Sequence, residues 1–210
     1  MKVQILVDNP NSWIVPYAQQ LNQLLIEKGC DSTLIHKHEQ VVKGDILLLL
    51  SCESIFKNLS FNKHNLVVHE SALPKGKGWS PLTWQILEGK NEIPITLFEA
   101  AESVDSGVIY EQAYIQFEGH ELLEELKHKQ GETTIELILN FIEKYPKIEG
   151  KSQQGEDSFY PKRTAKDSQL NTDKTLKELF NQLRVCDNER YPAFFELNGH
   201  KYYLKISKHD

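Results

Sequence analysis

Residues 65–87 read NLVVHESALPKGKGWSPLTWQIL, and this stretch decides the fold. Residues 66–69 form a short apolar run typical of a buried strand, and residues 80–87 have the pattern of a helix. The loop that joins them carries two lysines and two glycines. Backbone N–H groups and the dipole at such a helix start can bind an anion, whereas the alternative is an ordinary basic surface loop.

Strands and helices alternate on both sides of this stretch. The run at residues 46–50 is apolar on both faces, as in the central strands of a parallel sheet. Such alternation favours an α/β fold with a mostly parallel, Rossmann-like sheet and right-handed crossovers. The strands are expected at residues 3–7, 32–36, 46–50, 66–69, 95–98 and 107–113.

Three further helices are indicated by apolar residues at helical spacing. They are expected over residues 12–28, over residues 121–145 and in a short segment after residue 172. Ser12 is expected to cap the first of these helices, and Gly131 to break the second. Asp173 is expected to cap the third, whose inward face would consist of Leu176, Leu179, Phe180 and Leu183.

The C-terminal third has a different composition. Residues 147–167 are poor in apolar side chains, which predicts a loop or linker. Asn198-Gly199 separates two alternating runs, a strong signal for a β-hairpin. This hairpin is expected to pack against the sheet or to form a homodimer interface. We therefore expect a main domain at residues 1–146, a linker at 147–172, and a small helix-plus-hairpin extension at 173–210.

The composition excludes several classes of protein. With 40% hydrophobic and 26% charged residues among 210, the chain is globular rather than disordered. Its net charge of −6 gives no sign of a nucleic-acid-binding surface, so we expect no nucleic-acid partner. Asp8 comes too early for a secretory signal, and no apolar run approaches the roughly 20 residues that span a bilayer. We expect a cytoplasmic protein with no membrane partner.

The cysteines and histidines form no recognisable metal or disulfide pattern. Cys30, Cys52 and Cys186 are far apart and odd in number. His36 and His38 have no evident third ligand, so a solvated loop is expected there rather than a metal site. We therefore expect no metal.

The candidate catalytic residues lie in an ordered set of motifs. His69 is followed by SALP at residues 71–74 and GWSP at 78–81, and Asp105 comes 36 residues after His69, in VDSG at 104–107. This ordered set resembles the folate-dependent formyltransferase family, which includes methionyl-tRNA formyltransferases and sugar N-formyltransferases. The resemblance covers about residues 1–145, extends more loosely into the C-terminal third, and implies an α/β fold of the formyltransferase type.

By this resemblance, the chain is an enzyme that moves the formyl group of N10-formyltetrahydrofolate to an amine. The amine attacks directly, through a tetrahedral intermediate. His69 would stabilise the oxyanion or carry the proton, since imidazole titrates near neutrality. Asp105 would orient His69 or take the amine proton itself. The alternative is a histidine that caps a strand and an Asp-Ser-Gly turn, with no catalytic role.

The resemblance also places the two substrates. The folate would lie between the loop after the 46–50 strand and the loop before Asp105. The acceptor would lie beside His69, where lysines suit a phosphate or carboxylate and Trp79 suits a base or sugar ring. The residues expected to bind the folate co-substrate are Ser51, Cys52, Glu53, Ile55, Phe56, Ala101, Glu102 and Val104. Those expected to bind the acceptor are Asn9, Asn11, Ser12, Lys75, Lys77, Gly78 and Trp79.

One position departs from the family pattern. Val67 stands where the family has an asparagine, two residues before the histidine. Asn65 is two residues earlier still, about 6–7 Å away by strand rise, and cannot simply replace it. A backbone N–H group, Ser51 or Ser71 would then have to stabilise the oxyanion. Loss of one such donor typically costs roughly 10²–10³ in rate.

We expect an amino sugar as the acceptor, either nucleotide-linked or a precursor of a surface-glycan sugar. The acidic charge and the lack of a C-terminal barrel of about 100 residues argue against tRNA. The loop at residues 9–13 lacks the glycines usual in glycinamide ribonucleotide enzymes. The alternatives are another small amine such as glycinamide ribonucleotide, a non-catalytic protein that binds folate or a sugar nucleotide, and a glycosyltransferase, which would need a metal-binding acidic pair.

Overall fold

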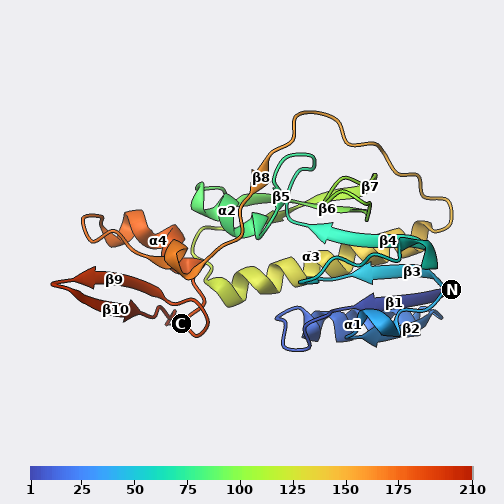
Figure 1. Cartoon of the computed structure of the whole chain (residues 1–210), viewed down its shortest axis with the longest axis horizontal. Helices are drawn as coiled ribbons and strands as arrows, with labels where there is room; N and C mark the ends of the chain where they lie inside the picture. The colour runs from blue at the N-terminus through green and yellow to red at the C-terminus, as the bar shows by residue number, and fades with distance from the viewer. Residues whose placement is uncertain (210) are drawn as a thin grey trace.

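The centre of the computed structural model, which describes residues 1–209, is a six-stranded sheet. Its strands are β1 (Lys2–Leu6), β2 (Asp31–Ile35), β3 (Gly44–Leu49), β4 (Asn62–His69), β6 (Glu92–Glu99) and β7 (Ile109–Gln116). They lie in the order β2-β1-β3-β4-β6-β7 (Figure 1). The first four pair in parallel, and β6 is antiparallel to both β4 and β7. The expected mostly parallel α/β fold is confirmed.

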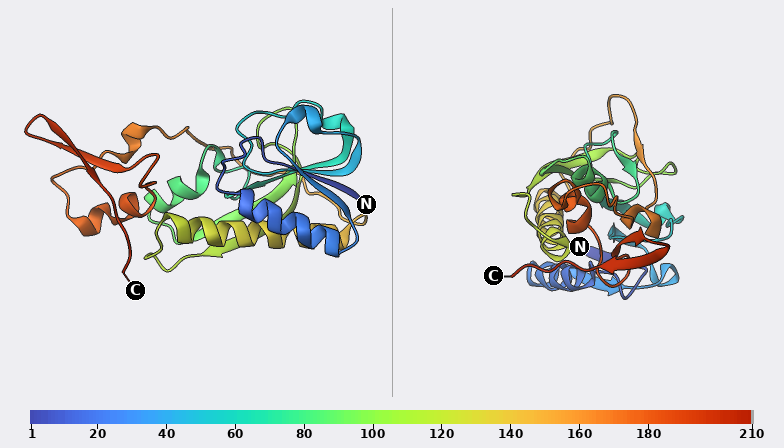
Figure 2. Two further views of the ribbon diagram at one scale, coloured as in Figure 1. Left: turned by 90° about the horizontal axis from the view of Figure 1, so that it is seen from below. Right: turned by 90° about the vertical axis from the view of Figure 1, so that its left-hand side faces the viewer.

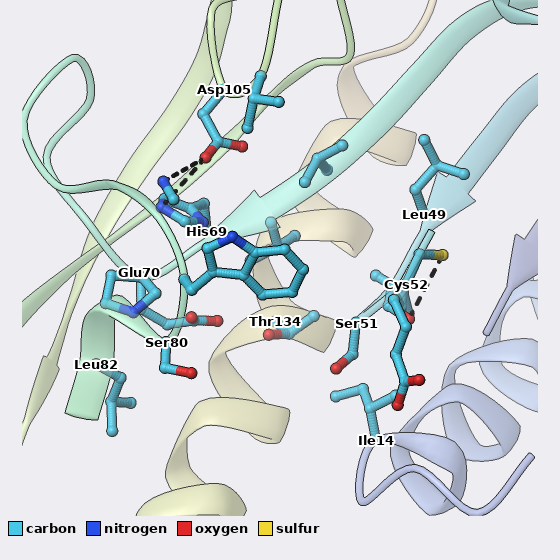
Figure 3. A pocket seen from close by; sticks show the side chains of 18 of the residues that line it. Ile14, Leu49, Ser51, Cys52, His69, Glu70, Ser80, Leu82, Asp105 and Thr134 are labelled. Atoms are coloured by element: carbon cyan, nitrogen blue, oxygen red, sulfur yellow. Dashed lines mark hydrogen bonds and ion pairs between the residues drawn. The ribbon is translucent and has the colours of Figure 1, made fainter. Parts of the chain in front are cut away.

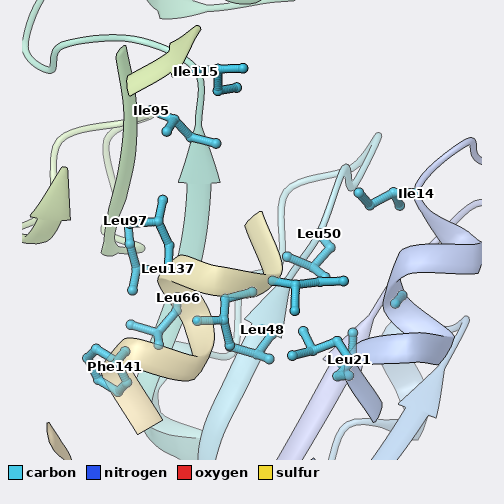
Figure 4. Close-up of a cluster of buried hydrophobic side chains, with 14 of the residues drawn as sticks. Ile14, Leu21, Leu48, Leu50, Leu66, Ile95, Leu97, Ile115, Leu137 and Phe141 are labelled. Carbon is cyan, nitrogen blue, oxygen red and sulfur yellow. The ribbon is translucent and has the colours of Figure 1, made fainter. Parts of the chain in front are cut away.

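Helices cover one face of this sheet. The helices of the chain are α1 (Val15–Glu27), α2 (Pro81–Leu87), α3 (Leu123–Lys144) and α4 (Leu176–Arg184). α1 and α3 lie side by side against the sheet (Figure 2). Their apolar faces pack on strand residues such as Leu48 and Leu66, which are fully or almost fully buried (Figure 4). This face therefore holds the main hydrophobic core.

Loops rather than helices cover the opposite face. Leu47 and Leu49 of β3 point to this side and pack with Phe56 from the loop after β3 and with Ala100 from the loop after β6. Val67 of β4 belongs to the same cluster. Because side chains alternate along a strand, His69 emerges on this face and Glu70 on the helix-covered one. The end of β4 thus places an ionisable side chain on each side of the sheet.

The boundaries of α1 and α3 differ from the sequence-based expectation. Ser12 does not cap α1, because Ile14 occupies the N-cap and the Ser12 carbonyl accepts from the Val15 N–H. Gly131 does not break α3, which runs through it without interruption. A β-carbon at Gly131 would lie 2.5 Å from the Tyr17 ring, so the glycine allows α1 and α3 to approach closely.

The C-terminal helix also begins later than expected. Thr175, not Asp173, caps α4, and it forms a reciprocal capping box with Glu178. Leu176 is 70% exposed and does not face inward, whereas Leu179 and Leu183 are buried. The hydrophobic face of the helix is therefore narrower than the spacing of its leucines suggested.

The segment expected to be a linker contributes to the main body. The short strand β8 (Phe159–Tyr160) pairs with β5 (Lys77–Gly78), beside the loop that follows β4. Beyond it, α4 and the hairpin of β9 (Ala193–Leu197) and β10 (His200–Leu204) lie at the end of the molecule opposite the N-terminus (Figure 1). They have a small core of their own. Asn198 and Gly199 both adopt positive φ, as the predicted two-residue turn requires.

Candidate active site

A cavity of about 660 Å³ lies where β3 and β4 end. The loops after β3, β4 and β6 line it, together with the start of α2 and one side of α3. His69, Asp105 and Glu70 all project into this cavity (Figure 3). Ligands of open α/β sheets bind at such strand ends, so this cavity is the candidate site.

His69 is the last residue of β4, and its ring is almost buried. Its Nε2 atom lies 2.9 Å from the carbonyl oxygen of Gly76 and 3.7 Å from the Asp105 carboxylate. A carbonyl only accepts hydrogen bonds, so Nε2 carries the proton of the neutral ring. Within residues 1–209, no side chain or backbone group is hydrogen-bonded to Nδ1, which is left to act on a substrate.

Asp105 reaches His69 by a route that sequence reasoning missed. β6 runs antiparallel to β4, so the loop after β6 leaves toward the opposite end of the strands from the loop after His69. It then turns back across the loop-covered face of the sheet. A β-carbon on Gly107 would lie 1.7 Å from the Glu99 carbonyl oxygen, so only glycine permits this return. Asp105 has a φ of 51° and accepts a hydrogen bond of 2.9 Å from the Gly78 N–H. Gln153 donates to its backbone carbonyl and fixes the loop from the segment after α3.

On the other side of the β4 end, Glu70 faces α3. Its Oε1 atom accepts a hydrogen bond of 2.7 Å from Gln130, and its backbone carbonyl accepts from Gln85 of α2. Burial raises the pKa of the Glu70 carboxyl, against the opposing effects of His69 and Gln130. Sequence reasoning missed Glu70, although its position directly after the candidate histidine could have indicated it.

The residues expected to bind the folate co-substrate all line the cavity. They come from two loops that are far apart in sequence, residues 51–56 and 101–104. Ile55 and Val104 are 68% and 51% exposed, which leaves apolar surface uncovered inside the site. Burial raises the pKa of the Cys52 thiol to about 12, so this cysteine stays protonated and is no nucleophile.

The residues expected to bind the acceptor divide into two groups. Gly78 and Trp79 line the cavity. Asn9, Asn11, Ser12 and Lys75 are not among its lining residues, and Trp13 and Ile14 line it instead. Lys77 is buried and forms an ion pair of 2.9 Å with Asp157 of the segment after α3. The structure therefore does not bring the two lysines together with His69 as a phosphate site.

The position of Val67 bears on oxyanion stabilisation. Val67 lines the cavity, so an amide there would face the space that His69 and Asp105 also line. The Asn65 side chain points elsewhere and donates to the Leu59 carbonyl. Ser71 is buried outside the cavity lining, whereas Ser51 lines it. Of these two serines, only Ser51 can therefore reach a ligand in the cavity.

Within residues 1–209, no helix is both long enough and apolar enough to cross a bilayer. The same residues contain no group of three or more histidine, cysteine or acidic side chains arranged to hold a metal ion.

Known proteins resemble this chain in sequence. The model of the formyl transferase family matches residues 27–142. A methionyl-tRNA formyltransferase from Thermodesulfovibrio yellowstonii is 30% identical over 129 residues, which are 60% of this chain and 42% of that protein. The chain spans about half the length, or less, of the curated relatives it matches.

Solved structures share the fold. A methionyl-tRNA formyltransferase from Clostridium thermocellum superposes with a TM-score of 0.84 at 19% identity, covering 100% of this chain and 94% of the other. A sugar N-formyltransferase from a Shewanella species gives 0.69 at 18% identity, covering 100% and 98%. HypX from Aquifex aeolicus, in complex with tetrahydrofolic acid, gives 0.76 at 17% identity, covering 98% and 37%. With more than half of its residues matched by the family model, this chain belongs to the formyl transferase family.

Proposed function

We propose that this chain transfers the formyl group of N10-formyltetrahydrofolate to the amine of an amino sugar. The observation that carries the proposal is the His69–Asp105 pair, 3.7 Å apart at the wall of the cavity. An imidazole beside a carboxylate can accept and return a proton. Formyl transfer to a nitrogen needs such a group and no covalent enzyme intermediate.

The loops after β3 and β6 suit the folate. A planar pterin ring needs apolar walls with a few polar groups at its edge. The uncovered side chains of Ile55 and Val104 supply two such walls, and Leu50 and Phe98 lie deeper in the same cavity. The bound co-substrate supplies the activated formyl carbon. The structural neighbour that holds tetrahydrofolic acid supports this part of the proposal.

His69 and Asp105 would then act on protons. The Gly76 carbonyl keeps the proton of the neutral ring on Nε2, so Nδ1 accepts the proton that the acceptor nitrogen loses as it attacks. The Asp105 carboxylate stabilises the positive charge that the ring then carries. The Gly78 N–H holds that carboxylate in place. Nδ1 returns the proton to the departing folate nitrogen.

The charges of the cavity bear on the acceptor. Four carboxylates line it, from Glu53, Glu70, Glu102 and Asp105, and Lys127 is the one lysine or arginine of the lining. This balance favours an acceptor that carries a cationic amine. Trp79 is 45% exposed at the cavity and offers a flat surface to a sugar ring. The sugar N-formyltransferase among the structural neighbours supports the same class of acceptor.

A screen of acceptors tests the proposal. Purified protein and N10-formyltetrahydrofolate are mixed with free amino sugars, nucleotide-linked amino sugars, glycinamide ribonucleotide and methionyl-tRNA, and products are analysed by mass spectrometry. We expect one formyl group to be added to an amino sugar. Formylation of methionyl-tRNA or glycinamide ribonucleotide alone would contradict the amino sugar as acceptor, but it would still support formyl transfer as the reaction.

Val67 supports a second candidate, a protein that binds folate or a sugar nucleotide without catalysis. The position lines the cavity but has no amide to stabilise an oxyanion. Tetrahydrofolate binding without transfer to any acceptor, unchanged by Val67→Asn, would favour this candidate.

A further inference from the structure

Glu70 is a cavity-facing carboxylate to which the mechanism above gives no role. We propose that Glu70 binds the ammonium group of the acceptor and takes one proton from it before the nitrogen attacks. This inference rests on the proposed formyl transfer and names the chemical form in which the acceptor enters: a primary ammonium.

The first support is position. Glu70 directly follows His69, and the two side chains leave opposite faces of the β4 end yet line one cavity (Figure 3). Gln85 of α2 fixes the Glu70 backbone, and Gln130 of α3 fixes its carboxylate. The carboxylate is thus held in place in the cavity that Asp105 also lines. An acceptor nitrogen that enters between the two walls meets Glu70 on one side and His69 on the other.

The second support is charge. Glu70 forms no ion pair with any lysine or arginine within residues 1–209, and the cation-bearing neighbour in the lining, Lys127, pairs with Glu124 and Asp187 instead. Removing a carboxylate from water without a cation is costly. A glutamine could accept the Gln130 hydrogen bond equally well, so this contact does not explain the charge. A ligand ammonium would supply the missing cation.

The third support is the proton balance of the reaction. A primary ammonium, R–NH₃⁺, must lose two protons to become the formamide R–NH–CHO. The first must leave before attack, because an ammonium has no free electron pair; it passes to the Glu70 carboxylate and then to solvent. The second leaves as the C–N bond forms and passes through His69 Nδ1 to the folate nitrogen, whose bond to the formyl carbon breaks. The raised pKa of Glu70 makes it a better base for the first step.

A matched pair of sugars tests the proposal without knowledge of the natural acceptor. Glucosamine carries the ammonium, and N-acetylglucosamine has the same ring without the charge. Binding of each is measured by ligand-observed NMR at neutral pH with tetrahydrofolate present. We expect the protein to prefer glucosamine by about tenfold, and Glu70→Gln to remove that preference. Glu70→Asp, which keeps the charge on a shorter side chain, should retain part of it.

The control is Glu136→Gln, the same charge change at an exposed α3 residue outside the cavity lining. It should keep the full preference for glucosamine. Tetrahydrofolate binding and thermal melting confirm that each variant is folded. Equal binding of the two sugars by the unsubstituted protein, or a preference that survives Glu70→Gln, would overturn the proposal.

A kinetic arm separates this inference from the proposed function. With an acceptor found in the screen, Glu70→Gln should raise KM for the acceptor at least tenfold, and Glu70→Asp should recover part of the loss. The charged and titratable groups that line the cavity with Glu70 are His69 beside it, Asp105, Cys52, Glu53 and Glu102 on the loops, and Lys127 on α3. If no amine is formylated, the proposed function fails, while the sugar-binding comparison still decides the role of Glu70.

Discussion

The Nε2 atom of His69 lies 3.7 Å from the Oδ2 atom of Asp105. The same carboxylate oxygen accepts the Gly78 N–H, and the same ring nitrogen faces the Gly76 carbonyl. The loop after β4 therefore holds both partners through its own backbone. This arrangement fixes the ring tautomer and leaves one nitrogen for the substrate, so the pair is organised before any ligand binds.

Substitution of either partner should abolish most of the transfer. We expect His69→Ala and Asp105→Asn each to reduce kcat by about 10²–10⁴, because each removes part of one proton-transfer unit. Tetrahydrofolate affinity should change little. The double variant should be scarcely slower than the worse single variant, since the two residues act together. His120→Ala, at a histidine outside the cavity lining, is the control; full activity in either site variant would refute the assignment.

Val67→Asn tests whether the site lacks an oxyanion donor. An amide at this position would face the cavity, and we expect kcat to rise about 10²-fold, at the lower end of the range that one donor contributes. Because Val67 packs in the apolar cluster with Leu49, the change should also cost about 1 kcal/mol of stability. Val67→Thr removes apolar surface without adding an amide and should not accelerate the reaction. Equal rates for the Asn and Thr variants would show that another group already donates the hydrogen bond to the oxyanion.

Glu70→Gln should stabilise the folded protein at neutral pH. The folded-state pKa of Glu70 is raised, so the folded protein binds its proton more tightly than the unfolded chain does. Stability is therefore greatest below the ordinary pKa of glutamate and falls as the pH rises through the folded-state pKa. Removing the charge should raise Tm by about 2–4 °C at neutral pH, and the gain should shrink as the pH falls toward 4. A lower Tm for the variant at neutral pH would contradict the unpaired charge.

Arg184 and Glu121 form a buried ion pair that joins α4 to the main body. Their side chains are 0% and 2% exposed, and Arg184 also donates to Asn91. Arg184→Met should cost about 3 kcal/mol in urea unfolding, because Glu121 keeps its charge and loses a partner. Lys28→Met breaks an exposed pair with Glu143 and should cost less than about 1 kcal/mol. Similar costs for the two variants would contradict this account.

The Glu121 carboxylate also predicts an acid limit to stability. Burial alone would raise its pKa, but the N–H groups of Glu118 and Gly119, together with Lys129, lower the pKa to about 2. A lowered pKa stabilises the fold above the ordinary glutamate value, and this stability is lost as the pH falls from about 4.5 toward 2. Glu121→Gln should flatten that part of the curve of stability against pH. Parallel curves of stability against pH for the unsubstituted protein and Glu121→Gln would argue against this role of the Glu121 carboxylate.

Local patterns in the sequence determined most of the elements and singled out the candidate catalytic pair, His69 and Asp105. The apolar runs predicted the parallel strands, because a strand buried on both faces needs apolar side chains at successive positions. Asn198-Gly199 predicted the hairpin, because a two-residue turn needs positive φ at both residues. The ordered motifs around His69 and Asp105 indicated the family, which the family model confirms over residues 27–142.

Only the tertiary structure decided what surrounds that pair. The antiparallel direction of β6, the return of its loop to His69 and the pairing of Lys77 with Asp157 depend on contacts between residues that are 27 to 80 positions apart. The direction of Glu70 toward Gln130 depends on how α3 packs on the sheet. Periodicity and propensity act over a few residues, whereas these contacts follow from the packing of whole elements around a shared core.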